Sequence, residues 1–320
     1  MKSAIIGCGA ISSVHADALI KQGGQIAALC DIREENARAL ADKFSPGCPI
    51  YSDYREMITK EKLDVVHICT PHYLHAQMAE FALDSGVNVL LEKPACISEE
   101  ELESLKAAER RSKARLAICL QNRYLEVTRA AKQFLEGKKV LGVLGTVFWI
   151  RDKEYYASSD WRGRKDKEGG GLMINQAIHT FDLMMYLGGE PKNLKASIAN
   201  RYHGDVSEVE DTAEIYWETE HGRAQLFATT AASCYYPINI RVHTSEGILE
   251  INGDCCKING VDIREAGFSP YGKSYWGIGH YYIIKDFYDC ISQGKEFPLG
   301  IHEAEKTHKA IFKIYRDNPL

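Results

Sequence analysis

The first 31 residues, MKSAIIGCGAISSVHADALIKQGGQIAALCD, decide the fold of the N-terminal half of this chain. A short apolar run at 2–6 leads into a glycine-rich turn, then into an amphipathic stretch at 11–22 and a second apolar run at 25–30. Apolar runs of this length predict buried strands, and the longer amphipathic stretch predicts a helix. A strand, a helix and a strand in this order predict a βαβ unit with parallel strands.

The same alternation continues to about residue 120. Further strands are expected at 63–69, 87–91 and 115–120, and further helices at 33–44, 73–85, 98–113 and 124–137. Because the strand runs are apolar on both faces, they indicate a parallel sheet covered by helices on both sides. We therefore expect an α/β, doubly wound Rossmann domain over 1–122.

The pattern of apolar and polar residues changes after this first domain. Between about 142 and 251 apolar and polar residues alternate, with turn signals at His221-Gly222 and Glu246-Gly247, which predicts an open, mostly antiparallel sheet. Helices are expected at 174–187, 279–293 and 301–316. An α+β domain for substrate binding and oligomerisation is therefore expected over 123–320, and a length of 320 residues fits two domains.

Composition narrows the class of protein. The formal net charge of −5 argues against broad binding to nucleic acid or to an anionic membrane surface. No secretory signal and no uninterrupted apolar stretch of about 18 residues is visible. The ten cysteines are scattered, several inside apolar runs, and none has the spacing of a zinc site. We expect a cytoplasmic protein with reduced cysteines and without a metal.

The glycine-rich turn, GCGAIS at 7–12, is a candidate dinucleotide site. Gly7 permits a tight turn, Gly9 lets a pyrophosphate approach the backbone, and the following helix offers free N–H groups. Asp31 can accept the ribose hydroxyls and would repel a 2′-phosphate, which favours NAD over NADP. Cofactor contacts are therefore expected from Gly7, Gly9, Ala10, Ile11 and Asp31. Arg33 is also a candidate, although it could equally be a solvated residue.

Two further segments follow strands and should lie at the carboxyl edge of the sheet, where ligands of doubly wound folds bind. They are TPHYLH at 70–75 and EKP at 92–94. Lys93 could polarise a substrate hydroxyl, or it could be a surface lysine paired with a carboxylate. His75 could contact the cofactor or only pack. The candidate cofactor residues of this edge are Thr70, Pro71, His72, His75, Glu92, Lys93 and Asn122.

A third segment, GGGLMINQAIHTFD at 169–182, completes a family pattern with GCGAIS, Asp31, TPHYLH and EKP. Together these motifs resemble the Gfo/Idh/MocA family, which includes glucose-fructose oxidoreductase and inositol dehydrogenase. The resemblance spans essentially the whole chain. It implies a Rossmann domain, a C-terminal domain with an open sheet, a pyridine nucleotide and a sugar or cyclitol substrate. It also implies homodimers or homotetramers that pair through the open sheets.

The spacing of Asn175 and His179 also indicates that the segment 169–182 is catalytic. Asn175 and His179 are four residues apart, so one helix would present both on the same face, and the preceding glycines would let a ligand approach the backbone. His179 is of the one side-chain type whose unperturbed pKa suits proton exchange near neutral pH. We assign His179 as the base, Lys93 as the group that polarises the hydroxyl and Asn175 as its orienting partner. Inositol-dehydrogenase-like members carry Asp in place of Asn175, which indicates a different substrate.

The remaining pocket candidates are weaker. Arg123 could line the substrate pocket or form an interdomain salt bridge, and Asp182 is expected to be a structural partner. The expected substrate-binding residues are Lys93, Arg123, Trp161, Asn175, His179, Tyr236 and His280. The predicted activity is NAD(P)-dependent hydride transfer between nicotinamide and a secondary alcohol or ketone of a sugar, sugar derivative or cyclitol. The alternatives are NAD-dependent glycoside cleavage on the same fold and a non-enzymic nucleotide sensor.

Overall fold

The structure is a computed structural model that describes residues 1–267, 271 and 277–320. The chain divides into two compact units. The first comprises Met1–Gln121 with Phe268–Glu305, and the second comprises Asn122–Gly267 with Lys306–Leu320. The first division follows residue 121, next to the boundary expected at 122. The segment from 277 to 305 was expected in the second domain, but here it groups with the first unit.

The first unit is built on a six-stranded parallel sheet with the strand order β3-β2-β1-β4-β5-β6. The strands are β1 (Lys2–Ile6), β2 (Gln25–Cys30), β3 (Ile50–Tyr51), β4 (Val65–Ile68), β5 (Asn88–Leu91) and β6 (Leu116–Ile118). Strand order reverses between β1 and β4, which confirms the doubly wound Rossmann fold and places its ligand crevice at that switch point. The sequence analysis did not predict β3, because two residues are too short to show a period.

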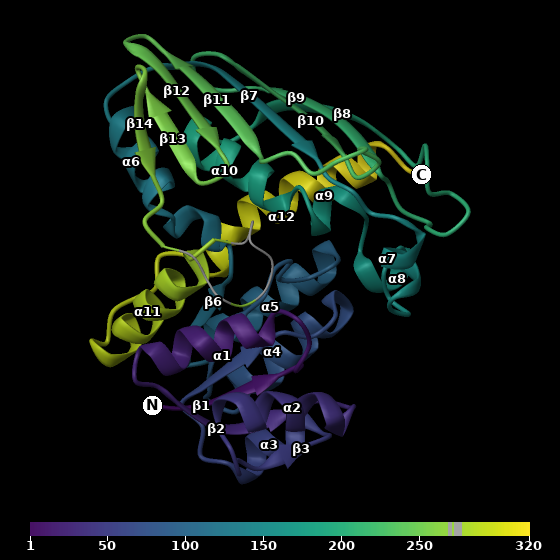
Figure 1. The fold of residues 1–320 in the computed structure, drawn as a ribbon, viewed down its shortest axis with the longest axis vertical. Helices are drawn as coiled ribbons and strands as arrows, with labels where there is room; N and C mark the ends of the chain where they lie inside the picture. The colour runs from purple at the N-terminus through teal and green to yellow at the C-terminus, as the bar shows by residue number, and fades with distance from the viewer. Residues whose placement is uncertain (268–270, 272–276) are drawn as a thin grey trace. The chain divides into compact units, whose positions relative to one another are not determined.

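Helices complete the first unit. They are α1 (Ser12–Lys21), α2 (Glu34–Phe44), α3 (Tyr54–Lys60), α4 (His75–Asp84), α5 (Glu99–Arg111) and α11 (Gly279–Ser292). In Figure 1, the yellow-green α11 lies beside the purple α1, although more than 250 residues separate them. The α11 side chains Ile283, Ile284 and Phe287 are fully buried. This burial explains why a C-terminal segment belongs to the N-terminal unit.

The second unit is built on an eight-stranded sheet with the order β14-β13-β12-β11-β7-β10-β9-β8. The strands are β7 (Val140–Phe148), β8 (Lys192–Ala199), β9 (Thr212–Glu218), β10 (Arg223–Thr229), β11 (Asn239–Thr244), β12 (Gly247–Asn252), β13 (Cys255–Ile258) and β14 (Val261–Arg264). All neighbours are antiparallel except β7 and β10. The predicted open, mostly antiparallel sheet is therefore confirmed.

Helices cover one face of this sheet. They include α6 (Glu126–Leu135), α9 (Leu172–Asn175) and α10 (Ile178–Gly188), which all lie on the same side in Figure 1. Two short helices, α7 (Lys153–Ala157) and α8 (Lys165–Glu168), precede α9, and the division between the units falls within α12 (Ile301–Asp317). On the other face Leu144, Tyr216 and Ile248 are exposed.

The helix expected over 174–187 is two helices, so the prediction of one continuous helix was wrong. Gln176 and Ala177 separate α9 from α10, and the Ala177 N–H donates to the Leu172 carbonyl, five residues back, at 2.7 Å. This wide turn is the spacing of a π-bulge, which is frequent at functional sites. Asn175 therefore ends one helix and His179 lies in the first turn of the next.

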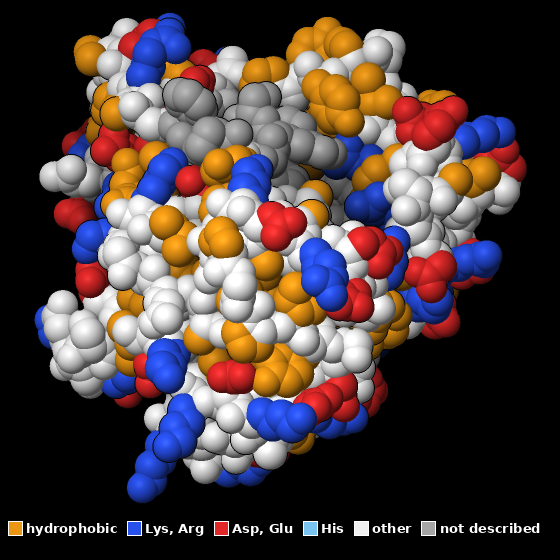
Figure 2. Space-filling model, turned by 60° about the horizontal axis from the view of Figure 1, so that its bottom comes forward, with side chains coloured by type: hydrophobic (Ala, Val, Ile, Leu, Met, Phe, Trp, Pro, Cys, Tyr) orange, Lys and Arg blue, Asp and Glu red, His pale blue; other side chains and the backbone are white. Residues whose placement is uncertain are grey.

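Two composition-based expectations can be compared with the structure. All ten cysteines are free, and seven of them are buried. Over the described part of the chain, no helix combines the length and the apolarity needed to cross a membrane. Figure 2 shows that basic and acidic side chains are interspersed on the face it presents.

Candidate active site

The glycine turn has the backbone geometry that a dinucleotide needs. Gly7 has a φ of +86°, and a Cβ at this position would lie 2.7 Å from the Cys69 carbonyl carbon and oxygen. Gly9 is different, because a Cβ there would meet nothing within 4 Å. The backbone at Gly9 is therefore open to a ligand, next to the N-terminus of α1, and the residues present fit a bound pyrophosphate.

This contrast predicts opposite outcomes for two alanine substitutions. Gly9→Ala should leave the thermal unfolding temperature within a few degrees of the wild-type value but weaken NAD binding by about tenfold or more, because the added methyl fills the space of the ligand. Gly7→Ala should lower stability by several kcal/mol, of the order seen for strained and overpacked sites. Thermal unfolding and calorimetric titration with NAD check both. Unchanged NAD affinity in Gly9→Ala would contradict this site.

Asp31 shapes the same turn. Its Oδ2 accepts a hydrogen bond from the Cys8 N–H and its Oδ1 accepts one from the Arg33 N–H, both at 2.8 Å. The carboxylate thus fixes the glycine turn and the start of α2, and its remaining lone pairs face outward for a ribose. Arg33 is exposed at the N-terminus of α2. The turn residues Ala10 and Ile11 directly precede α1, and Ala10 is exposed.

The carboxyl ends of β4 and β5 carry the next group of candidates. From Val89 to Cys96 every side chain is buried except that of Lys93, which is partly exposed. A single cationic side chain thus emerges from a buried strand end, at the edge where ligands of this fold bind. Thr70 and Pro71 at the end of β4 are also partly exposed, whereas His72 is buried.

His75 links the two strand ends. Its Nδ1 lies 2.6 Å from the Pro94 carbonyl oxygen and its Nε2 lies 2.8 Å from the Thr70 carbonyl oxygen, and its side chain is buried. Burial lowers the pKa of His75. Both ring nitrogens are thus used within the protein, and this geometry favours the packing alternative, in which His75 holds the Thr70 and Lys93 segments together.

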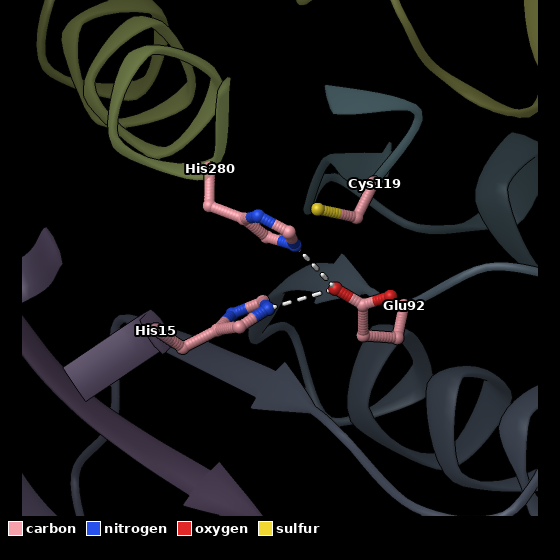
Figure 3. A group of neighbouring side chains, drawn as sticks. All are labelled: His15, Glu92, Cys119 and His280. Carbon is pink, nitrogen blue, oxygen red and sulfur yellow. Dashed lines mark hydrogen bonds and ion pairs between the residues drawn. The ribbon is translucent and has the colours of Figure 1, made fainter. Parts of the chain in front are cut away.

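His280 lies in the first unit, beside Glu92. Its Nε2 is 3.2 Å from the Glu92 Oε1, and only 2% of its surface is exposed. Burial lowers the pKa of His280. A direct contact of His280 with substrate therefore stays a prediction, while its contact with an expected cofactor residue is visible in Figure 3.

In the second unit, the two predicted catalytic residues stand out by exposure. Every residue from Gly170 to Met185 is buried except Asn175 and His179, which are partly exposed. The glycines before them are explained by packing and not by ligand approach. A Cβ at Gly170 would lie 2.2 Å from the Tyr315 hydroxyl, and one at Gly171 would lie 2.2 Å from the Glu210 carbonyl oxygen.

A buried carboxyl group that sequence reasoning missed lies next to Asn175. Glu168 is 1% exposed and accepts a hydrogen bond from the Asn175 side-chain amide, which also donates to the Tyr155 hydroxyl at 3.2 Å. Burial raises the pKa of Glu168 to about 7. In the sequence Glu168 ends the charged run KDKE, which is typical of a solvated surface, and only its position before the glycine triplet could have marked it.

The raised pKa of Glu168 predicts a pH-dependent stability. The ordinary pKa is 4.5 and the folded-state pKa is about 7, so the folded protein holds this proton more tightly than the unfolded chain does. The contribution of the Glu168 proton to the free energy of unfolding is complete below about pH 4.5, and it is lost as the pH rises to about 7. In urea unfolding, the free energy of unfolding of wild type should therefore decrease, relative to that of Glu168→Gln, as the pH rises over this range. A difference independent of pH would contradict the assignment.

Arg123 takes part in a buried ion pair within the second unit. Its Nε and Nη2 donate to the two Asp182 carboxylate oxygens, each at 2.7 Å, and Thr307 donates to Asp182 Oδ1 at the same distance. Arg123 is 9% exposed and Asp182 is 1% exposed. The expected structural role of Asp182 agrees with this geometry, and Arg123 is a salt-bridge residue whose partner lies in its own unit.

The remaining candidates lie in different places in the second unit. The Asn122 carbonyl accepts a hydrogen bond from Thr128 at 2.7 Å. Trp161 is partly exposed, with the Arg162 guanidinium 5.5 Å from its ring centre. Tyr236 is 57% exposed and its ring lies against Phe148. None of these positions is tied to Asn175 by a described contact, so their role in binding stays a prediction.

A parallel doubly wound sheet with an open glycine turn and an acidic residue after β2 defines a dinucleotide-binding α/β protein. Residues 1–119 match the family model of an oxidoreductase family with an NAD-binding Rossmann fold, GFO/IDH/MocA. Residues 128–250 match the model of the GFO/IDH/MocA C-terminal domain. The chain belongs to this family of NAD-binding oxidoreductases.

Individual relatives agree with this assignment. D-glucoside 3-dehydrogenase of Escherichia coli is 29% identical over 60% of this chain, an alignment that spans 55% of that enzyme. Inositol 2-dehydrogenase of Salmonella typhimurium is 25% identical over 78% of this chain and 74% of its own. The WlbA dehydrogenase of Bordetella pertussis, solved with NADH and UDP-GlcNAcA, has the same fold with a TM-score of 0.87 at 24% identity, covering 99% of this chain and 96% of its own.

Proposed function

We propose that this protein is an NAD-dependent dehydrogenase that interconverts a secondary alcohol and a ketone on a sugar, a sugar derivative or a cyclitol. The observation that carries the proposal is the exposure pattern of two buried segments. Lys93 is the one partly exposed side chain of the β5 end, and Asn175 and His179 are the two partly exposed side chains between Gly170 and Met185. Among them, Lys93 can polarise a hydroxyl group and His179 can accept its proton.

The roles follow from the chemistry of these side chains. NAD, when bound, accepts a hydride from the carbinol carbon. Lys93 carries a positive charge that stabilises the developing alkoxide oxygen, and His179 accepts the hydroxyl proton. In this proposal residues of 1–122 hold the nucleotide and residues of 123–320 hold the substrate.

Asn175 contributes orientation, and its neighbours determine which atom it presents. Its amide nitrogen is used by Glu168 and the Tyr155 hydroxyl. The Asn175 carbonyl oxygen is the acceptor of this side chain, and in this proposal it accepts a hydrogen bond from a substrate hydroxyl. An Asp at this position, as in the inositol-dehydrogenase-like branch, would put two carboxylates against each other, which explains why Asn accompanies Glu168 here.

The remaining parts of the proposal concern cofactor choice and assembly. Asp31 would repel a 2′-phosphate, so NAD is preferred over NADP. We propose a cytoplasmic homodimer or homotetramer that pairs through the open face of the eight-stranded sheet. Leu144 and Tyr216 support this, because both are exposed and both flank Gln225 on one face in the strand register.

A substrate screen tests the activity. The purified protein is incubated with NAD or NADP and a panel of hexoses, glycosides, sugar acids and cyclitols, and reduced nicotinamide is followed by its absorbance. We expect NAD reduction with at least one polyol and weaker or no reduction of NADP. NAD binding without any reduction across the panel would favour the nucleotide-sensor alternative. Release of an aglycone without accumulation of NADH would favour glycoside cleavage.

A further inference from the structure

Glu92 is a buried carboxylate with hydrogen-bond partners from two other elements and from its own backbone neighbour. Its Oε1 lies 2.9 Å from His15 Nε2 and 3.2 Å from His280 Nε2, and its Oε2 accepts from the Lys93 N–H at 3.2 Å. The Cys119 Sγ lies within 4.8 Å of the carboxylate. Figure 3 shows the His15 and His280 rings turned toward Glu92, with Cys119 nearby.

The donors are themselves held by a chain of hydrogen bonds that crosses the unit. His15 Nδ1 lies 3.0 Å from His67 Nδ1, His67 Nε2 lies 2.8 Å from the Tyr288 hydroxyl, and that hydroxyl lies 2.6 Å from Ser3 Oγ. If His15 donates to Glu92 through Nε2, then its Nδ1 must accept from His67 and His67 Nε2 must accept from Tyr288. Every donor in the chain then points toward Glu92.

Glu92 is the anion of this arrangement. Burial disfavours ionisation of Glu92, but the hydrogen bonds from His15 and His280 outweigh it and hold the pKa of Glu92 well below its usual range. Burial lowers the pKa of both His67 and His280, so these imidazoles are neutral donors. Aligned hydrogen bonds in a dry interior strengthen one another, and they stabilise the Glu92 carboxylate there.

The strand order places this anion on one side of the ligand crevice. The glycine turn follows β1 and Asp31 follows β2, so the pyrophosphate and the adenosine ribose belong to the β1–β2 side of the switch point. The nicotinamide half of a dinucleotide then extends over the other side, where β4 and β5 end. Glu92 directly follows β5, and its neighbour Lys93 carries the opposite charge.

We propose that Glu92 is a positioning residue whose fixed negative charge makes the protein bind the oxidised, cationic form of the nicotinamide cofactor in preference to the reduced, neutral form. This inference rests on the proposed function. Without the carboxylate, Lys93 would be the one charge of the Glu92–Lys93–Pro94 segment, and it would repel the oxidised ring. Glu92 is therefore expected to set the balance between the two cofactor forms, in addition to anchoring the Lys93 backbone.

Binding constants for both cofactor forms test this. Calorimetric titration with NAD and NADH gives a ratio of affinities for wild type, Glu92→Gln and Glu92→Asp. We expect Glu92→Gln to shift the ratio toward NADH by about tenfold or more, and Glu92→Asp to stay within about threefold of wild type. Glu56→Gln, the same change at an exposed site paired with Lys60, should leave the ratio unchanged. An equal loss of both affinities in Glu92→Gln would mean a purely structural role and overturn the proposal.

If Glu92→Gln does not fold, the ratio of NAD and NADH affinities in Lys93→Met tests the proposal independently. Removal of the cation should shift the ratio in the opposite direction, toward NAD, and an unchanged ratio would contradict charge control at this edge. Wild-type protein that binds neither cofactor form would contradict the proposed function itself. Wild-type protein that binds both, together with an unaltered ratio in both variants, would overturn this inference alone.

A measurement on the unmodified protein examines the network directly. Two-dimensional 15N NMR of the histidine rings should show the proton on Nε2 of His15 and His280 and on Nδ1 of His67. One potential ligand atom from each of His15, Glu92, Cys119 and His280 lies within 4.8 Å of the other three, so a metal ion is the competing explanation. Stoichiometric zinc by elemental analysis, with His15 protonated on Nδ1, would overturn the proposal.

Discussion

Lys93→Met is expected to lower kcat for polyol oxidation by at least about two orders of magnitude while NAD still binds. Loss of one preorganised donor to a developing oxyanion typically costs about 10²–10³ in rate, and Met keeps the length of the side chain without its charge. Lys93 is the one partly exposed side chain between Val89 and Cys96, so its replacement leaves the buried packing of that segment in place. Steady-state kinetics and calorimetric titration with NAD measure the two quantities.

The matched control is Lys60→Met, because Lys60 is an exposed helix residue paired with Glu56. It should have wild-type activity. Full activity in Lys93→Met would remove this residue from the mechanism, and loss of NAD binding together with activity would assign it to the cofactor site alone.

Asp182→Ala is expected to destabilise the protein by about 3–5 kcal/mol, the usual cost of removing one partner of a buried ion pair. The Arg123 guanidinium, which is 9% exposed, would lose both of its 2.7 Å hydrogen bonds to this carboxylate. Thr307 would lose its acceptor as well. Urea unfolding measures the difference in free energy of unfolding.

Asp84→Ala is the matched control for that substitution. The Arg111 Nε and Nη2 donate to the two carboxylate oxygens of Asp84, each at 2.7 Å, but both side chains are 49% exposed. An exposed pair is worth about 0–1 kcal/mol, so this variant should unfold near the wild-type urea concentration. Equal effects of the two substitutions would show that the Arg123–Asp182 pair is no more than a surface contact.

Much of the fold could be predicted from local patterns, because its strands and helices are long enough to show a period. The apolar runs at 2–6 and 25–30 are β1 and β2 residue for residue, and the tight turn predicted at Gly7 has a φ of +86°. These features depend only on neighbours in the sequence, which is why a single sequence is sufficient to predict them.

Other features depend on contacts between distant residues and could not be predicted. The segment with α11 joins the first unit because its apolar side chains pack with α1 and because His280 and Tyr288 reach Glu92 and His67. In the sequence, Glu168 belongs to a charged run that is typical of a solvated surface. In the structure, it is buried beside Asn175. No spacing rule connects the members of these pairs, so only the structure could bring them together.

Transfer of deuterium from the substrate tests the dehydrogenase assignment most directly. A polyol from the panel that carries deuterium on its carbinol carbons is incubated with the protein and NAD, and the nicotinamide is analysed by NMR and mass spectrometry. We expect NADH that carries one deuterium at C4, and much slower formation of this product in Lys93→Met and His179→Ala. Deuterium that stays on the polyol, or that returns to a cleaved sugar without accumulating on the nicotinamide, would contradict the dehydrogenase assignment.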